Sequence, residues 1–418
     1  MITWANLRAS AAPWLVLPIL VYAALYIDDA TFTAPSGYGV ESGELVAHAV
    51  AVIAPAVAAA AAWEAGRHRL LAALTSTGQR SAARQLLRAV TPVLILLFVL
   101  VLGALVVARR ATGVLPGGEA GWLAVAHLIV LSLGWMVIGW CLGLMAPRSI
   151  AAPSAGVVCW AWLSMPHAMS NSWMRHLGGF IDGLSTVTDV VTPAVYVVPW
   201  CFVAGLALAF WLLARIRQRV LAVVIACAVV AVTFVVGRAS VIDWGFQNPT
   251  SPRNVAVVCV GQAPRVCVPP EYEPYAGQLR QDALSPLARL KSAGVVAPAE
   301  LRIASADVAL KPGTWPLFWS PPPRGGTQEP AEYAANLAES AVTGTAALAG
   351  VRDCRQPGST PAAWAALVTG VDEQGVKTAL PPAEWSTLQK IRRLPAAEQA
   401  DWFAKAAADQ KHCGEVLS

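Results

Sequence analysis

Seven stretches of the chain are apolar and long enough to cross a lipid bilayer, and all of them end before residue 240. A membrane-spanning helix needs about 20 predominantly apolar residues. The stretches that meet this requirement are residues 10–27, 45–63, 89–108, 121–146, 150–169, 194–214 and 220–237. We therefore expect a polytopic α-helical membrane protein over residues 1–240 and a water-soluble domain over residues 241–418.

The first apolar stretch could also be a secretory signal peptide. It is preceded by one cation, lacks a clean small-residue cleavage site and is followed by six further spans, so we interpret it as a retained helix. Charged residues make up only 13% of the chain, against about 25% in soluble proteins, which agrees with a membrane location. No basic stripe interleaved with aromatic residues occurs, and we expect no nucleic acid partner.

Arginine placement predicts the orientation, because cations in short loops are retained on the cytoplasmic side. With the amino terminus inside, the cytoplasmic segments hold ten arginines and the outer short loops hold three. The exception is the pair Arg109 and Arg110, which falls in an outer loop and could mean that the third or fourth span is misassigned. Seven spans from this start place the carboxy-terminal domain outside the plasma membrane.

The cysteine distribution gives a second indication of the orientation. Four cysteines lie within spans, where we interpret them as small buried hydrophobic residues, and four lie in the carboxy-terminal domain. An even number in an exported domain predicts two disulfides, Cys259–Cys267 and Cys354–Cys413. A hairpin centred near Ala263 would place Cys259 opposite Cys267. The alternative is a cytoplasmic domain with four unpaired thiols.

The connection between the second and third spans, residues 64–88, is the longest cytoplasmic loop and carries five arginines. Leu70, Leu71 and Leu74 share one face of a short helix whose opposite face is basic. Such a helix, lying along the membrane and followed by a turn, can present a rigid surface to a cytoplasmic protein. The alternative is an ordinary basic loop that binds anionic lipid. The residues of the expected docking element are Glu64, Gly66, Arg67, Leu70, Leu71, Leu74, Arg80 and Arg84.

Residues 1–215 resemble the permease subunit of an ABC-2-type ATP-binding cassette transporter of the actinobacterial type. The resemblance rests on six spans, an amino terminus inside, the acid–glycine–leucine pattern after the second span, and a polar segment between the fifth and sixth spans. It implies that residues 64–88 form a coupling helix that binds a separate ATPase chain, and that two permease protomers enclose the path. Residues 216–240 are then an additional, seventh transmembrane helix.

The resemblance also gives residues 171–193 a role at an outer gate. In the family this segment folds into short helices that dip back into the membrane. Gly178, Gly179 and Gly183 permit such a broken path, and Trp173 and Asp182 are further gate candidates. The alternative is a plain outer loop with Trp173 at the membrane interface.

Isolated ionisable residues in membrane spans are functional hypotheses by default. Glu44 and His48 lie one helical turn apart at the outer end of the second span, and His127 lies within the fourth. We favour structural roles over a proton relay, because a single histidine can satisfy itself on a backbone carbonyl. Gly139 and Gly143 have the spacing of a helix contact, although we favour chance in a chain so rich in alanine and glycine.

The carboxy-terminal domain begins with a hairpin signal and continues with helical patterns, which predicts an α+β domain with its own core. The expected helices are residues 277–292, 330–348, 360–369, 382–393 and 396–410. The domain has one histidine, His412, and no Gly-x-Ser-x-Gly sequence, so neither a metalloprotease nor a serine hydrolase is expected. A binding, gating or partner-recognition role remains.

The sequence thus predicts the membrane-spanning subunit of an ATP-driven transporter, and the resemblance implies export of a hydrophobic or amphipathic substrate. The chain has no Gly-x-x-x-x-Gly-Lys-Ser/Thr phosphate loop, so we expect no enzyme activity, with ATP and magnesium held by the partner ATPase. The predicted partners are that ATPase, a second permease protomer and the lipid membrane, and no metal is expected on this chain. The alternative is a membrane sensor or immunity protein that displays the outer domain without transporting a substrate.

Overall fold

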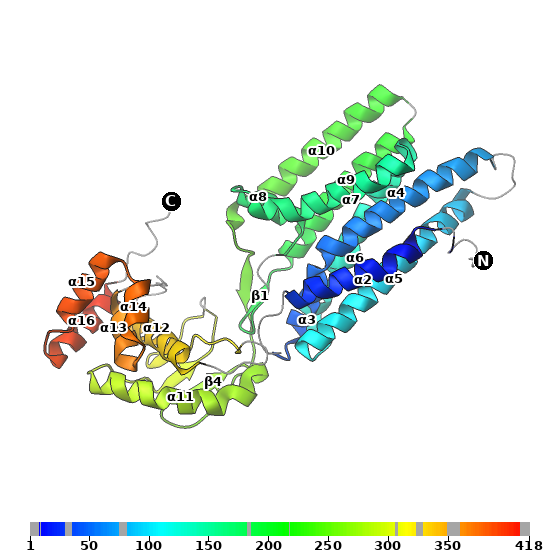
Figure 1. The fold of residues 1–418 in the computed structure, drawn as a ribbon. Helices are drawn as coiled ribbons and strands as arrows, with labels where there is room; N and C mark the ends of the chain where they lie inside the picture. Colours follow the sequence, from blue (N-terminus) through cyan, green and yellow to red (C-terminus); the bar gives the residue numbers. More distant parts are fainter. Residues whose placement is uncertain are drawn as a thin grey trace. The chain divides into compact units, whose positions relative to one another are not determined.

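The structure is a computed structural model that describes residues 8, 10–29, 36–74, 82–181, 185–216, 218–305, 308–322, 329–348 and 360–409. The chain divides into two compact units (Figure 1). The first unit comprises Met1–Phe32, Gly37–Thr186 and Val190–Ser251, and the second comprises Thr33–Ser36, Val187–Asp189 and Pro252–Ser418. The main division therefore falls a short distance beyond the expected boundary at residue 240.

The first unit is a bundle of long helices (Figure 1). Its helices are α2 (Ala12–Asp29), α3 (Gly39–His48), α4 (Val50–Leu74), α5 (Ala82–Thr112), α6 (Gly118–Met145), α7 (Arg148–Ser164), α8 (Ser172–Gly178), α9 (Ala194–Arg215) and α10 (Arg219–Val241), with 3-10 helices η1 (Met165–Ala168) and η2 (Ile242–Trp244). Among the described residues, six helices are long and apolar enough to cross a membrane: Ala12–Asp29, Val50–Leu70, Leu86–Thr112, Gly118–Met145, Ala194–Arg215 and Arg219–Trp244. They correspond to six of the seven expected spans and are typical of a multi-pass membrane protein.

The fifth expected span, residues 150–169, is not one long helix. Its place is taken by α7, which has 17 residues, and by η1, where Pro166 ends the α-helical hydrogen bonding. α7 runs antiparallel to α4. A Cβ atom added at Gly66 would lie 2.7 Å from Cβ of Arg148, and one at Gly156 would lie 3.5 Å from the carbonyl oxygen of Pro55. α7 therefore follows α4 along the bundle although it is shorter than expected.

The centre of the bundle is the contact between α4 and α6, and glycine makes this contact possible. A Cβ atom added at Gly139 would lie 2.2 Å from the carbonyl oxygen of Ala58, and one at Gly143 would lie 2.1 Å from that of Ala62. Real atoms cannot approach so closely, so the two backbones meet only because these positions lack side chains. The Gly139–Gly143 pair is a helix contact, and the preference for chance was wrong.

α3 and the start of α6 approach each other in the same way. A Cβ atom at Gly43 would lie 2.1 Å from the carbonyl oxygen of Gly121, and the amide of Gly117 donates to the carbonyl of Gly39 at 3.0 Å. α3 and α4 thus run parallel to α6 from Gly39 to the contact at Gly143. α4 and α6 are joined through α5, which crosses the bundle in the opposite direction, so α4 and α6 have to run in the same direction.

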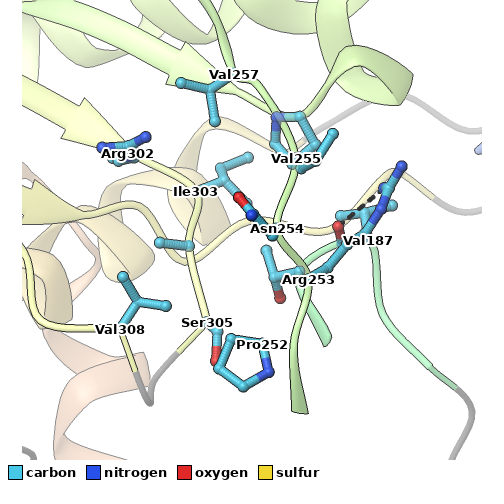
Figure 2. Close-up of a pocket in the computed structure, with 13 residues that line it drawn as sticks. Val187, Pro252, Arg253, Asn254, Val255, Val257, Arg302, Ile303, Ser305 and Val308 are labelled. Atoms are coloured by element: carbon cyan, nitrogen blue, oxygen red, sulfur yellow. Dashed lines mark hydrogen bonds between the residues drawn. The ribbon is translucent and has the colours of Figure 1, made fainter. Parts of the chain in front are cut away.

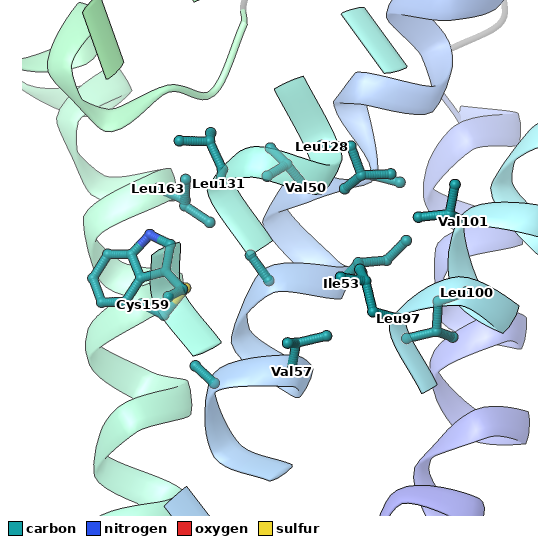
Figure 3. Close-up of a cluster of buried hydrophobic side chains, with 14 of the residues drawn as sticks. Val50, Ile53, Val57, Leu97, Leu100, Val101, Leu128, Leu131, Cys159 and Leu163 are labelled. Carbon is teal, nitrogen blue, oxygen red and sulfur yellow. The ribbon is translucent and has the colours of Figure 1, made fainter. Parts of the chain in front are cut away.

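Large aliphatic side chains fill the remaining space between α4, α5, α6 and α7 (Figure 3). In the membrane span of α4, 78% of the residues are buried inside the bundle, against 17% in the span of α10. α4 is therefore the central helix, and α10 lies at the periphery with an apolar surface suited to lipid. The core cluster includes Val50, Ile53, Val57, Leu97, Leu100, Val101, Leu128, Leu131, Cys159 and Leu163.

Arg109 and Arg110 do not mark a misassigned span. α5 and α6 are two separate helices, as expected, joined at a turn where Gly113 has a φ of 79°. The two arginines are exposed in the last turn of α5. Cations are stabilised at this position by the negative end of the helix dipole, which explains why they stand against the general charge bias.

The second unit is an α+β domain built on a four-stranded sheet in the order β3-β4-β5-β6. β3 and β4 form an antiparallel hairpin, whereas β4, β5 and β6 are parallel. Another, two-stranded sheet lies mostly in the first unit and pairs β1 (Asp189–Val191) with β2 (Thr250–Pro252). The remaining elements are β3 (Val258–Val260), β4 (Arg265–Val268), η3 (Pro270–Tyr272), α11 (Glu273–Ser292), β5 (Glu300–Arg302), β6 (Thr314–Pro316), α12 (Pro330–Leu348), α13 (Thr360–Thr369), α14 (Glu373–Ala379), α15 (Pro382–Ile391) and α16 (Ala396–Ala408).

The predicted hairpin and one of the two predicted disulfides are confirmed. Cys259 and Cys267 are direct register partners in the β3–β4 pair and form a disulfide. Cys354 and Cys413 lie outside the described residues, so their pairing stays a prediction. The five expected helices of this domain are all present, while α14, β5 and β6 were not expected.

Candidate functional site

The carboxylate of Glu44 binds the segment between α8 and α9 to the bundle. Glu44 lies in α3 and is only 1% exposed. The backbone amide of Ser185 donates to one carboxylate oxygen at 2.6 Å, and the Ser185 hydroxyl donates to the other at 2.5 Å. The hydroxyl of Tyr196, in the first turn of α9, donates to the same carboxylate at 3.3 Å. One acid thus connects α3, α9 and the intervening segment.

Burial raises the pKa of the Glu44 carboxyl to about 7, and the hydrogen bonds from Ser185 and Tyr196 oppose this rise only in part. α3 precedes the membrane-spanning part of α4, Val50–Leu70, so Glu44 lies outside that span. The protonation state of Glu44 therefore changes near neutral pH. The carboxyl is the acceptor for three donors, the amide and hydroxyl of Ser185 and the hydroxyl of Tyr196.

His127 holds the other end of the same segment. It is fully buried in α6, with Nε2 2.6 Å from the carbonyl oxygen of Gly179 and Nδ1 2.9 Å from the indole nitrogen of Trp200. An indole N–H only donates and a carbonyl only accepts, so the two bonds require a neutral imidazole with its proton on Nε2. A second proton on Nδ1 would face the donor of Trp200. The geometry favours the structural role over a relay.

Together these residues fix both ends of residues 179–185. The ring of His127 packs edge-on against Tyr196, with 5.4 Å between ring centroids, so the two sets of contacts are continuous. Gly179 is itself required, because its φ is 81° and a Cβ atom there would lie 2.7 Å from Cδ1 of Leu131. We call this group of contacts the segment clamp. Its members are Glu44, His127, Gly179, Ser185, Tyr196 and Trp200.

The segment expected at the outer gate is not a plain loop. Residues 171–193 contain the short helix α8. Nε2 of His176, in α8, donates a hydrogen bond to the carbonyl oxygen of Gly245 at 3.0 Å. The guanidinium of Arg238 lies 5.8 Å from the ring centroid of Trp173. Trp173 is partly buried and Gly178 is buried, while Asp182 and Gly183 lie outside the described residues.

At the other end of α4, Glu64 anchors the first helix of the bundle. It is 2% exposed, and one carboxylate oxygen accepts from the Ser10 hydroxyl at 2.8 Å and from the Ala11 amide at 3.2 Å. The other oxygen pairs with Arg67 at 3.2 Å. A carboxylate at the start of α2 satisfies amides that have no partner within the helix and is favoured by the helix dipole. Glu64 is thus an internal anchor and not an exposed docking residue.

The expected amphipathic helix along the membrane is not a separate element, because α4 continues without a break through Leu74. This end of α4 packs on α6 and α7: Arg69 donates to the carbonyl of Leu144 at 3.0 Å, and Arg148 lies 4.8 Å from the ring centroid of Trp63. Leu70 is 54% exposed. The side chains of Leu71, Leu74, Arg80 and Arg84 lie outside the described part of the chain.

The sequence reasoning missed the partners that complete both sites. Tyr196 and Trp200 are four residues apart at the start of α9, so they share a helix face, which could have indicated a common role. Ser10 immediately precedes an apolar run, which is the position of a helix-capping residue.

No group of three or more histidine, cysteine, aspartate or glutamate side chains in the described ranges could hold a metal ion. Residues 266–413 match a family model described as "Domain of unknown function (DUF7224)". The matched region begins in β4, lies within the second unit and includes none of the helix bundle. No curated protein matches the chain, and no solved structure matches it.

Proposed function

We propose that the chain is the membrane-spanning permease subunit of an ATP-driven transporter of the ABC-2 type. The observation that carries this proposal is the segment clamp. The polar segment between α7 and α9 forms a short helix, α8, and is bound to the bundle after α8, by His127 at Gly179 and by Glu44 at Ser185. This is the position at which the resembling family builds its outer gate.

The charges of the bundle support an amino terminus in the cytoplasm. Arg67, Arg69 and Arg148 gather at the end of α4 that follows its membrane span. Glu41, Glu44 and Glu119 lie at the other end, the first two in α3 and the third at the start of α6. Cations prefer the cytoplasmic side, so α4 runs from outside to inside.

Counting α7 as a crossing helix gives seven crossings, because α7 follows α4 in the antiparallel direction. The second unit then lies outside the plasma membrane. The Cys259–Cys267 disulfide supports this side, since disulfides persist in oxidising compartments.

The partner ATPase binds ATP and magnesium and hydrolyses the ATP, and it docks on the exposed part of residues 64–88, which includes Leu70. α4 joins this docking end to α3, whose Glu44 belongs to the segment clamp. Movement of the ATPases is transmitted to the opposite gate through α4 and α3, which follow each other along the chain. Two protomers enclose the path, and the substrate is an exported hydrophobic or amphipathic molecule.

Purification of the full chain from its native membrane tests the proposal. We expect a co-purifying chain that carries a Gly-x-x-x-x-Gly-Lys-Ser/Thr phosphate loop, identified by mass spectrometry. Replacing Leu70, Leu71 and Leu74 by aspartate should abolish this association and leave membrane insertion intact, because burying those charges in an interface is costly. Leu115→Asp is the matched control, since Leu115 is 52% exposed between α5 and α6, at the other end of the bundle. Equal loss of the ATPase in both variants, or a sensor kinase in its place, contradicts the assignment.

A further inference from the structure

A cavity of about 330 Å³ lies within the second unit, at the carboxyl ends of two parallel strands. Its lining includes Pro269, which follows β4, and Arg302 and Ile303, which lie at the end of β5. Figure 2 shows Arg302 and Ile303 among the lining side chains. In open sheets with parallel strands, ligands bind in the crevice outside the carboxyl ends of the strands. The cavity thus stands at the position where this type of sheet most often holds a ligand, and its volume is at the lower end for small-molecule sites, about 300–1,000 Å³.

The wall formed by residues 187–188 and 252–254 is held in place by Arg253. The backbone amide of Arg253 donates to the carbonyl of Thr188 at 2.8 Å, and its guanidinium donates to the carbonyl of Val187 at 3.2 Å. The same guanidinium pairs with Glu271 at 2.7 Å. Arg253 is therefore occupied as a strut, and the cavity is formed before any ligand arrives, which reduces the ordering cost of binding.

The chemistry of the cavity points to an anion with an apolar body. The lining residues include two arginines and no acidic residue. The side chain of Arg302 is 34% exposed, and its contact with Glu300, at 3.9 Å, is long for an ion pair. The carboxamide of Asn254 lies near the centre of the cavity, beside Ile303 (Figure 2). Branched apolar side chains complete the lining, namely Val187, Val255, Val257, Ile303 and Val308.

We propose that this cavity binds a small amphipathic carboxylate of about the size of a dipeptide with branched aliphatic side chains. The guanidinium of Arg302 receives the carboxylate, because its planar donors match the two oxygens. Asn254 hydrogen-bonds a neighbouring amide of the ligand, and the valine and isoleucine side chains pack on its aliphatic groups. The inference does not depend on the permease assignment, since it concerns the second unit alone.

Calorimetric titration of the full chain in detergent micelles tests this site, with N-acetyl-valyl-valine as the probe and empty micelles as the blank. We expect the free acid to bind at least tenfold more tightly than its carboxy-terminal amide. Arg302→Met should remove this preference, whereas Arg393→Met, at an exposed arginine in the same unit, should keep it.

Val257→Trp fills the cavity without touching the charge, so it should abolish binding of both probes. The proposal would be overturned if the unaltered protein bound the free acid and the amide with equal affinity, or bound neither at millimolar concentration. Both of these measurements use the unaltered protein, so they do not depend on the folding of a variant. Unchanged binding by a folded Arg302→Met protein would overturn the role of Arg302.

Discussion

Burial of Glu44 beneath Ser185 and Tyr196 makes the stability of the bundle depend on pH. The pKa of Glu44 in the folded state, about 7, lies above its ordinary value of 4.5, so the folded protein retains a proton that the unfolded chain releases. The stability that Glu44 contributes through this retained proton is fully present below the pKa of the unfolded chain. It is lost as the pH rises through the pKa of Glu44 in the folded state.

We predict that the thermal unfolding midpoint of the protein in detergent falls between about pH 5 and about pH 8. Glu44→Gln should flatten this dependence, because glutamine mimics the protonated carboxyl. Glu119→Gln, at an exposed acid at the start of α6, should leave the dependence unchanged. Identical slopes in the unaltered protein and in Glu44→Gln would contradict the assignment of this titration to Glu44.

His127 allows a double-mutant cycle. His127→Phe leaves two buried groups without partners, the carbonyl of Gly179 and the indole N–H of Trp200, at about 1–3 kcal/mol each. Trp200→Phe leaves only Nδ1 of His127 unpaired. We therefore expect the double variant to lose less thermal stability than the sum of the two single variants. Strict additivity would show that the bond between His127 and Trp200 contributes nothing.

The sequence marked Glu44 and His127 as unusual, because ionisable groups in or beside membrane spans are rare. Their partners could not be found in the same way. Ser185 is 141 residues from Glu44 and Tyr196 is 152 residues from it, and no local spacing encodes contacts at such separations. Glu64 shows the opposite error, since its place in a basic loop indicated an exposed residue, whereas the start of α2 covers it.

At the scale of elements, the contact between α4 and α6 is the most sensitive to substitution. Gly139→Ala forces a methyl group against the carbonyl of Ala58, and overpacking of this kind typically costs about 1–3 kcal/mol. We predict a lower thermal midpoint and a smaller monodisperse fraction in gel filtration. Gly277→Ala in α11 is the matched control, since nothing lies within 4 Å of its added Cβ, and it should keep or raise the midpoint. A tolerated Gly139→Ala would show that the helices can separate freely.

Helices of the second unit were predicted closely from the sequence. Residues 330–348 and 360–369 coincide with α12 and α13, where Pro330 and Pro361 mark the first turns. β5 and β6 were missed because strands of three residues are too short to show an alternating pattern. The ends of α4 were also missed, since helical hydrogen bonding continues beyond the point where the apolar run stops.

For the whole molecule, the division after Ser251 predicts where the chain can be cut. Residues 242–251 belong with the bundle: the carbonyl of Gly245 accepts from His176, and that of Phe246 accepts from Arg175 at 3.1 Å. Truncation after Ser251 should therefore give a folded, monodisperse bundle. Truncation after residue 240 removes both acceptors and should lower the thermal midpoint. Aggregation of both truncated proteins would show that the second unit is needed for the bundle to fold.

The disulfide supplies a test of orientation on intact cells. We predict that a membrane-impermeant reductant followed by a membrane-impermeant maleimide labels Cys259, the half-buried cysteine of the disulfide, without lysis, as mapped by mass spectrometry. The buried Cys141 and Cys159 should stay unlabelled and serve as internal controls. Labelling of Cys259 only after lysis would place the second unit in the cytoplasm.

The direct backbone contact of α4 with α6 restricts how the bundle can change shape. Helices separated by layers of side chains can slide by changing rotamers, but two backbones in contact at Gly139 and Gly143 have no such layer to rearrange. α4 and α6 therefore move as one lever, and any rocking is confined to their joints with the peripheral helices. Leu70 lies in the last turns of α4 and Glu44 lies in α3, which directly precedes α4, so we expect a displacement of this lever at Leu70 to move the helix end next to Glu44 as well.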